Sequence, residues 1–104
     1  MTFFQSNHEG ALIDRIHALA DTGIAGYLVN FGAYSHTSIA LHDALKSVAP
    51  LPAIEVHISN VWKREGFRHE SLLSPIAAGI IVGLGPDGYQ LAVDALMRIL
   101  KGRE

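Results

Sequence analysis

Residues 26–38 read Gly-Tyr-Leu-Val-Asn-Phe-Gly-Ala-Tyr-Ser-His-Thr-Ser, and this stretch contains the transition that decides the fold. The apolar run Tyr27–Val29 is typical of a buried strand, which turns polar at Asn30. Gly32 permits a tight turn. The next segment has helical periodicity, with an apolar side formed by Ile39, Ala40, Ala44, Leu45 and Val48. A strand that ends at an asparagine and is followed by a helix predicts the crossover loop of a βα unit.

The same alternation continues through the rest of the chain. Pro50 and Pro52 end the second helix and introduce a strand over Ala53–Ile58, and a third strand is predicted over Ala78–Val82. Residues 60–75 are predicted to form a long loop. The last helix follows a glycine-rich turn at residues 83–88, and its predicted apolar face consists of Leu91, Ala92, Ala95, Leu96, Ile99 and Leu100.

Helix capping accounts for several of the remaining polar residues. An early helix is indicated by Leu12, Ile13, Ile16, Leu19 and Ala20 at helical spacing. Ser6 or Asn7 is expected to cap it, and Ser38 or Thr37 to cap the helix after the first strand. Repeated βα units predict an α/β protein with a parallel sheet flanked by helices, forming one domain over residues 1–104.

The composition excludes several classes of protein. The formal net charge is −2 and the chain shows no basic patch, which argues against nucleic-acid binding. Without cysteine the chain has no disulfides and no thiolate metal ligands. No apolar run is long enough to cross a bilayer, and the N-terminus lacks the pattern of a signal peptide. We expect a soluble, cytoplasmic protein without nucleic-acid or membrane partners.

Polar side chains gather where the strands end. In a parallel sheet these ends share one edge, so Asn30, His36, His57 and Ser59 are expected to lie close together. Arginines at 64 and 68 would bring positive charge from the loop above. Because arginine binds carboxylates in a bidentate manner, the constellation suits a small anion that also carries hydroxyl groups.

Plainer interpretations exist for the same residues. Taken alone, His57 is more often a half-buried, hydrogen-bonded histidine than a functional one. A metal site formed by His36, His42 and His57 is disfavoured, since the first two are six residues apart rather than four. The Gly-x-Gly-x-x-Gly pattern at 83–88 follows the last strand and not the first, so a simple turn is favoured over dinucleotide binding.

Four stretches carry a resemblance to a known family: QSNHEGALIDRIH, VNFGAYSHTSIALHDAL, EVHISN and REGFRHESLLSPIAAGIIVGLGPDGYQLAVDAL. In this order, and almost without gaps, they resemble type II 3-dehydroquinate dehydratase. The resemblance implies a flavodoxin-like fold and a homo-oligomer, a trimer or a dodecamer. It also implies a lyase of the shikimate or quinate pathway, which eliminates water in the anti sense from 3-dehydroquinate to give 3-dehydroshikimate, without cofactor or metal.

The resemblance implies roles for individual residues. His57 matches the general acid that protonates the departing hydroxyl, a task that suits an imidazole because it titrates near neutral pH. Asp43 matches an aspartate that reaches the substrate pocket of a neighbouring subunit. Arg64 matches a supporting loop arginine. The remaining matches are substrate-binding residues: Asn30, His36, Ile58, Ser59 and Arg68.

The sequence departs from the family in two places. Phe31 replaces a proline next to Asn30, which is expected to loosen the asparagine. The family's first strand, its lid with an arginine and the base tyrosine, and its first helix match nothing here, and no tyrosine of this chain occupies the base position. We therefore expect an N-terminally truncated sheet and impaired activity. Thr2–Phe4 would either pair beside Tyr27–Val29 or leave an edge for another chain to cover.

Three functional hypotheses remain open at this point. The first is the family's dehydratase activity. The second is a non-catalytic module, derived from that family, that binds small anions or supports oligomerisation. The third and weakest is a small nucleotide-binding protein that uses the glycine turn at 83–88.

Overall fold

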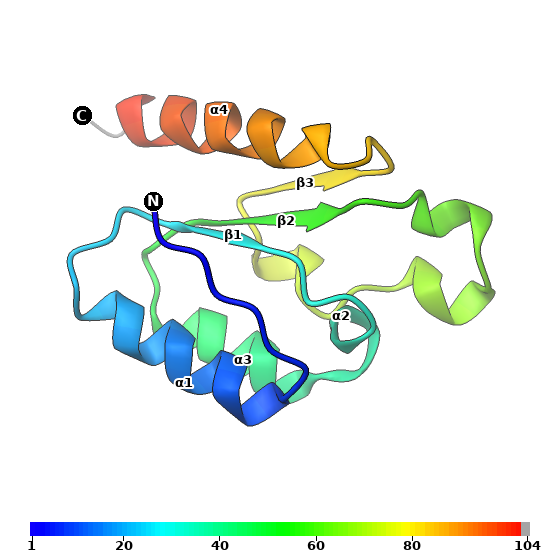
Figure 1. Ribbon diagram of the computed structural model, residues 1–104, viewed down its shortest axis with the longest axis horizontal. Coiled ribbons are helices and arrows are strands. Elements are labelled where there is room, and N and C mark those ends of the chain that lie inside the picture. Colours follow the sequence, from blue (N-terminus) through cyan, green and yellow to red (C-terminus); the bar gives the residue numbers. More distant parts are fainter. Residues whose placement is uncertain (103–104) are drawn as a thin grey trace.

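The chain folds into a three-stranded parallel sheet between two layers of helices, in a computed structural model that describes residues 1–102 (Figure 1). The strand order is β1-β2-β3, with Tyr27 opposite Ala53 and Ile54 opposite Gly79. The predicted parallel α/β class is confirmed. The elements are α1 (Glu9–Ala20), β1 (Tyr27–Val29), α2 (Tyr34–Thr37), α3 (Ile39–Ser47), β2 (Ala53–His57), β3 (Gly79–Val82) and α4 (Asp87–Gly102).

The two faces of the sheet have separate apolar cores because side chains alternate along each strand. Tyr27, Val29 and Ala53 face α1 and α3, where they pack with Ile16 and Leu41. The opposite face of the sheet packs against α4 through Ile54, Val56 and Ala92. Figure 1 shows α4 alone on one side of the sheet and the α1–α3 pair on the other. Every residue of β2 is buried, as expected for the central strand.

The turns follow the predicted chemistry. Gly83 and Gly85 have positive φ angles of 83° and 65°, which a glycine adopts without strain, and together they form the simple turn expected before α4. The Ser38 side chain accepts a hydrogen bond from the backbone N–H of Leu41 at 2.9 Å, so the predicted cap of α3 is confirmed.

Several element boundaries differ from the sequence-based expectation. The cap of α1 is His8, without a side-chain bond, because the Ser6 hydroxyl accepts from the His8 N–H before the helix begins. The second strand ends at His57 rather than Ile58. The expected loop over 60–75 contains three short 3-10 turns, at Val61–Lys63, Gly66–His69 and Ser74–Ile76. Leu91 was expected on the apolar face of α4, but it is 46% exposed and is not among the side chains that pack against the core on that side of the sheet.

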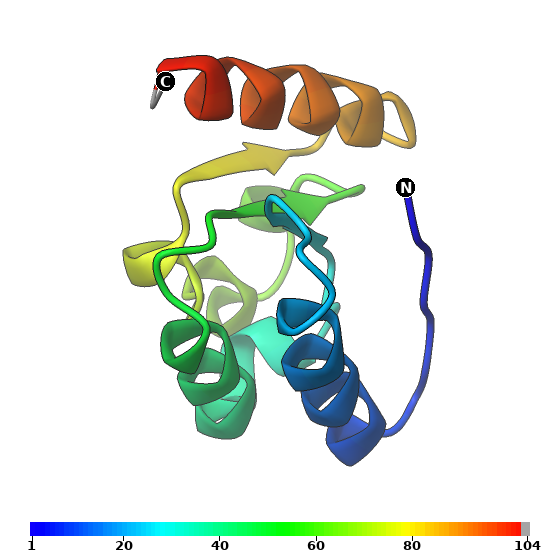
Figure 2. The same cartoon turned by 90° about the vertical axis from the view of Figure 1, so that its left-hand side faces the viewer.

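The N-terminal segment does not take the first of the two expected arrangements. Residues 1–6 have no strand structure, and Figure 2 shows them running apart from the sheet. Thr2–Phe4 therefore does not pair beside β1, and Phe3 is 84% exposed. Among the described residues β1 pairs with β2 alone, which leaves its other edge open. Within residues 1–102, no helix combines the length and the apolar character needed to cross a membrane.

Candidate active site

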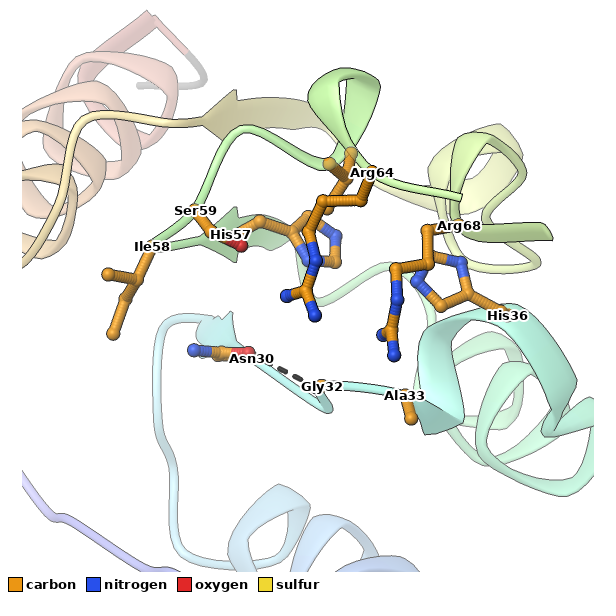
Figure 3. A pocket seen from close by; sticks show the side chains of 10 residues that line it. Asn30, Gly32, Ala33, His36, His57, Ile58, Ser59, Arg64 and Arg68 are labelled. Carbon is orange, nitrogen blue, oxygen red and sulfur yellow. Dashed lines mark hydrogen bonds between the residues drawn. The ribbon is translucent and has the colours of Figure 1, made fainter. Parts of the chain in front are cut away.

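A pocket of about 200 Å³ opens at the carboxyl ends of β1 and β2, where the sequence places its polar loops. Figure 3 shows the side chains of both arginines extending into it from the loop above the sheet. The pocket contains all the predicted site residues except Asp43. Its lining is Asn30, Gly32, Ala33, His36, His57, Ile58, Ser59, Val61, Arg64 and Arg68.

His57 reaches the pocket from the last position of β2, and its ring is held by a buried glutamate. Glu55 lies two residues earlier, and therefore on the same face of the strand. Its side chain is 1% exposed, and its Oε2 is hydrogen-bonded to Nε2 of His57. An ionised carboxylate in that position fixes the ring orientation and stabilises a positive charge on the imidazole.

Two serines complete the surroundings of Glu55. Ser71 donates to Oε2 at 2.8 Å and Ser74 donates to Oε1 at 2.7 Å. Burial alone raises the pKa of Glu55, but hydrogen bonds from His57, Ser74 and Ser71, with the charge of a protonated His57, outweigh burial and hold the pKa below the ordinary glutamate value. Glu55 is therefore a carboxylate at neutral pH despite its burial.

His36 is the second imidazole of the pocket, and it comes from the short helix α2. Its Nδ1 bonds the backbone carbonyl of Glu70, so that nitrogen carries the ring proton. The other ring nitrogen, Nε2, remains available as a hydrogen-bond acceptor for a ligand hydroxyl. The rings of His36 and His57 are stacked, with centroids 6.3 Å apart and an interplanar angle of 18°. Two imidazoles thus line one wall of the pocket, as the sequence predicted.

Arg64 and Arg68 supply the positive charge of the pocket, although one of them is partly engaged. Nε of Arg68 donates to a carboxylate oxygen of Glu65 at 2.7 Å, and its guanidinium lies 5.0 Å from the centre of the Phe67 ring. Arg64 lies 4.0 Å from the same carboxylate. Because Glu65 is exposed and acts through a short turn, it orients the arginines without burying their charge.

Asn30 is held at both ends of its amide. Its Oδ1 accepts from the backbone N–H of Gly32 at 3.1 Å, and its Nδ2 donates to the hydroxyl of Tyr89 at 2.8 Å. Asn30 thus has two hydrogen-bond partners although Phe31 stands in place of the proline, and the Phe31 side chain packs against the core beside α1 and α3. The contact with Tyr89 joins α4 to the pocket, and no periodicity in the sequence pointed to it.

Asp43 lies outside the pocket. Its side chain is 68% exposed on α3 and contacts His42 at 3.0 Å. Asp43 therefore has no role in the pocket of its own chain, and the expected contact with a neighbouring subunit's pocket stays a prediction. His42 is engaged with that aspartate and does not line the pocket with His36 and His57.

The hydroxyls of all three tyrosines of the chain take part in hydrogen bonds. The Tyr27 hydroxyl donates to the carbonyl of Ile16 at 2.7 Å, and the Tyr34 hydroxyl donates to the carbonyl of Asn7 at 2.9 Å. The Tyr89 hydroxyl accepts from Asn30. None of them lines the pocket. Within residues 1–102, the pocket lining therefore contains two imidazoles, two arginines and other polar groups but no phenol.

Glu55 is the residue beside the pocket that was not predicted from the sequence. The signal was available, because a glutamate inside an otherwise apolar strand and two residues before His57 must share a face with it. Burial of a carboxylate in a central strand also requires hydrogen-bond donors to compensate it. The donors, Ser71 and Ser74, lie in an irregular loop whose path no periodicity predicts.

Comparison with known proteins assigns this arrangement to a family. The sequence pattern described as Dehydroquinase class II matches residues 1–97. The chain belongs to the dehydroquinase class II family. The pocket at the ends of β1 and β2 thus lies within the matched part of the chain, and so do Glu55 and His57.

Individual dehydroquinase relatives agree with this assignment. The chain is 61% identical over 94 residues to a 3-dehydroquinate dehydratase of Chelativorans sp. (strain BNC1), covering 90% of this chain and 64% of that protein. It is 58% identical to the Mesorhizobium japonicum 3-dehydroquinate dehydratase, of which it covers 65%. The crystal structure of a type II dehydroquinase from Butyrivibrio crossotus superposes with a TM-score of 0.87 at 53% identity, over 89% of this chain and 64% of that one. The chain thus spans slightly less than two thirds of these relatives.

Proposed function

We propose that this chain binds 3-dehydroquinate, or a closely similar hydroxy-carboxylate, and supplies the acid half of its dehydration to 3-dehydroshikimate. One observation carries the proposal: His57, which is hydrogen-bonded to the buried Glu55, lines a pocket that two arginines overhang. The family membership and the names of the relatives support the same reaction.

In this reaction His57 is the general acid. The C2–H electrons form the new double bond as a base takes the proton, and the C–O bond to the departing hydroxyl breaks. A protonated His57 gives its proton to that oxygen, so water leaves and the imidazole becomes neutral. Nε2 faces Glu55, which leaves Nδ1 as the nitrogen that delivers the proton. The Glu55 carboxylate stabilises the imidazolium before this transfer.

The other pocket residues suit the remaining groups of the substrate. Arg68 and Arg64 carry the positive charge that attracts a carboxylate. Nε2 of His36 accepts from a ring hydroxyl, because its Nδ1 proton is already used by the carbonyl of Glu70. Ser59 and the backbone after β2 offer further hydrogen-bonding groups beside His57. No step of this scheme requires a metal or a cofactor.

Binding is tested by calorimetry with 3-dehydroquinate or with quinate as an unreactive analogue. Arg68→Ala removes charge-assisted hydrogen bonds and should weaken binding by about 1.5–3 kcal/mol, or roughly 10- to 150-fold. Arg98→Ala is the matched control, since it removes the same charge from an exposed position on α4. Equal affinity in the wild type and the Arg68 variant would refute the assignment of the pocket.

A non-catalytic anion-binding module is the second candidate function, and it is favoured because no tyrosine of residues 1–102 lines the pocket. It shares the pocket with the first, so calorimetry alone does not separate the two. Turnover does: binding without measurable dehydration by the 104-residue polypeptide would support the module. The nucleotide-binding hypothesis has no support, because Gly83 and Gly85 form a simple turn and do not line the pocket.

We also propose that the chain assembles as a homo-oligomer, a trimer or a dodecamer, in the cytoplasm. Large apolar side chains are exposed on several elements, including Ile39 at 67%, Trp62 at 63% and Met97 at 61%. The unpaired edge of β1 is a further surface that a monomer would leave open. A chain without cysteine is compatible with a reducing compartment. Light scattering at about micromolar concentration tests the assembly, and a monodisperse monomer would contradict it.

A further inference from the structure

The serine next to the buried carboxylate has a hydrogen-bonding arrangement that restricts where protons can lie. Oγ of Ser71 accepts from the backbone N–H of Leu73 at 3.1 Å and from that of Ser74 at 3.2 Å. A hydroxyl oxygen has two lone pairs and one proton. Both lone pairs of Ser71 are therefore occupied, and its only proton points to Oε2 of Glu55 at 2.8 Å.

This arrangement makes Ser71 an obligatory donor. It has no lone pair left to accept a proton from a neutral Glu55, so Oε2 has to act as the acceptor in that contact. The same Oε2 also faces Nε2 of His57. An oxygen that accepts the Ser71 proton is favoured as part of a carboxylate, and a carboxylate oxygen can only accept, so its contact with Nε2 requires the ring proton to lie on that nitrogen.

We propose that Ser71 is a positioning residue that acts through Glu55 to keep the ring proton of neutral His57 on Nε2. The Nδ1 nitrogen of His57 then faces the ligand without a proton until the ring is protonated. In the imidazolium the added proton is carried by Nδ1, which is the nitrogen suited to deliver it. This last consequence, though not the tautomer itself, rests on the proposed function.

Ser74 provides a comparison within the same cluster. Its hydroxyl donates to Oε1, the oxygen that does not contact His57. Among the described residues its oxygen accepts no backbone N–H, so it is able to accept a proton from Glu55 as well as to donate one. Ser74 therefore stabilises the carboxylate without dictating the direction of the hydrogen bond to the histidine.

The tautomer is measured by long-range proton–nitrogen NMR of the histidine rings, at a pH about two units above the ordinary histidine value of about 6.5. The signals of His57 are assigned by their absence in His57→Gln. In the wild type, Nε2 is expected to have the nitrogen chemical shift of a protonated ring nitrogen, and Nδ1 that of an unprotonated one. A wild-type spectrum with the proton on Nδ1 would overturn the proposal before any serine variant is made.

The variants then test Ser71 itself. Ser71→Ala should shift the Nε2 resonance toward that of an unprotonated ring nitrogen and the Nδ1 resonance toward that of a protonated one. Ser71→Thr, which keeps a hydroxyl, should restore the wild-type chemical shifts. Ser74→Ala should shift both nitrogens much less. A Ser71→Ala protein that is folded by circular dichroism and keeps the wild-type tautomer would refute the role of Ser71.

These measurements use the free protein without substrate. The tautomer result therefore stands or falls independently of whether the chain binds or dehydrates 3-dehydroquinate.

Discussion

Replacing Glu55 by alanine is expected to be among the most destabilising single changes in this chain. The substitution leaves the Ser71 and Ser74 hydroxyls and the His57 ring without their buried acceptor. Removing one partner from a buried charged cluster typically lowers the free energy of unfolding by about 3–5 kcal/mol. A folded domain typically has a free energy of unfolding of about 5–15 kcal/mol, so this variant of the 104-residue chain would lose a large part of its stability.

Glu55→Gln separates the charge from the shape of the side chain. The amide keeps one acceptor oxygen but turns an N–H group toward a donor, which should cost about 1–3 kcal/mol at neutral pH. Because the folded-state pKa of Glu55 is lowered, its carboxylate contributes stability above the unfolded value of about 4.5 and loses it as pH falls further. The free energy of unfolding of the wild type should therefore approach that of Glu55→Gln as the pH falls below about 4.5.

Urea denaturation followed by far-UV circular dichroism measures both quantities by linear extrapolation. The control is Asp94→Asn, which removes a carboxylate from an exposed position of α4 and should change stability by less than about 0.5 kcal/mol. If assembly contributes, the comparison is made at one protein concentration. If the wild type and Glu55→Gln differ in free energy of unfolding by the same amount at acidic and neutral pH, the view that Glu55 is ionised in the folded protein is refuted.

Two further predictions concern the helix cap and turnover. Ser38→Ala removes the acceptor of the Leu41 N–H and should lower the free energy of unfolding by about 1 kcal/mol. Thr37→Ala should have a smaller effect, because Thr37 does not cap α3 and makes only a long hydrogen bond of 3.5 Å to the Ala33 carbonyl. Equal effects of the two substitutions in denaturation would contradict the cap. A polypeptide of residues 1–104 by itself should dehydrate 3-dehydroquinate very poorly, because positioned acid–base groups contribute roughly 10²–10⁴-fold and its tyrosines do not line the pocket. The ultraviolet absorbance of the enone product tests this, and turnover at the level of the full-length relatives would show that another group acts as the base.

The amino-acid sequence by itself determined the class of the fold and the place of the site. Apolar runs such as Tyr27–Val29 and the helical periodicity after Ser38 depend only on local burial, which the pattern of residues reports directly. Because parallel strands end at one edge, His57 and Asn30 had to lie close together. His36 and Arg68 were expected at the same edge from their loops, their substrate-binding roles were implied by the resemblance, and the pocket contains both of them.

Only the tertiary structure decided how these groups are held. Glu55 depends on hydroxyls 16 and 19 residues away, and Asn30 depends on a tyrosine 59 residues away. Such contacts join loops to strands and helices that are distant in the chain, so no local period encodes them. The course of Thr2–Phe4 was left open for a related reason. Strand pairing depends on which neighbour is present at the edge of the sheet, and residues 2–4 do not specify that neighbour.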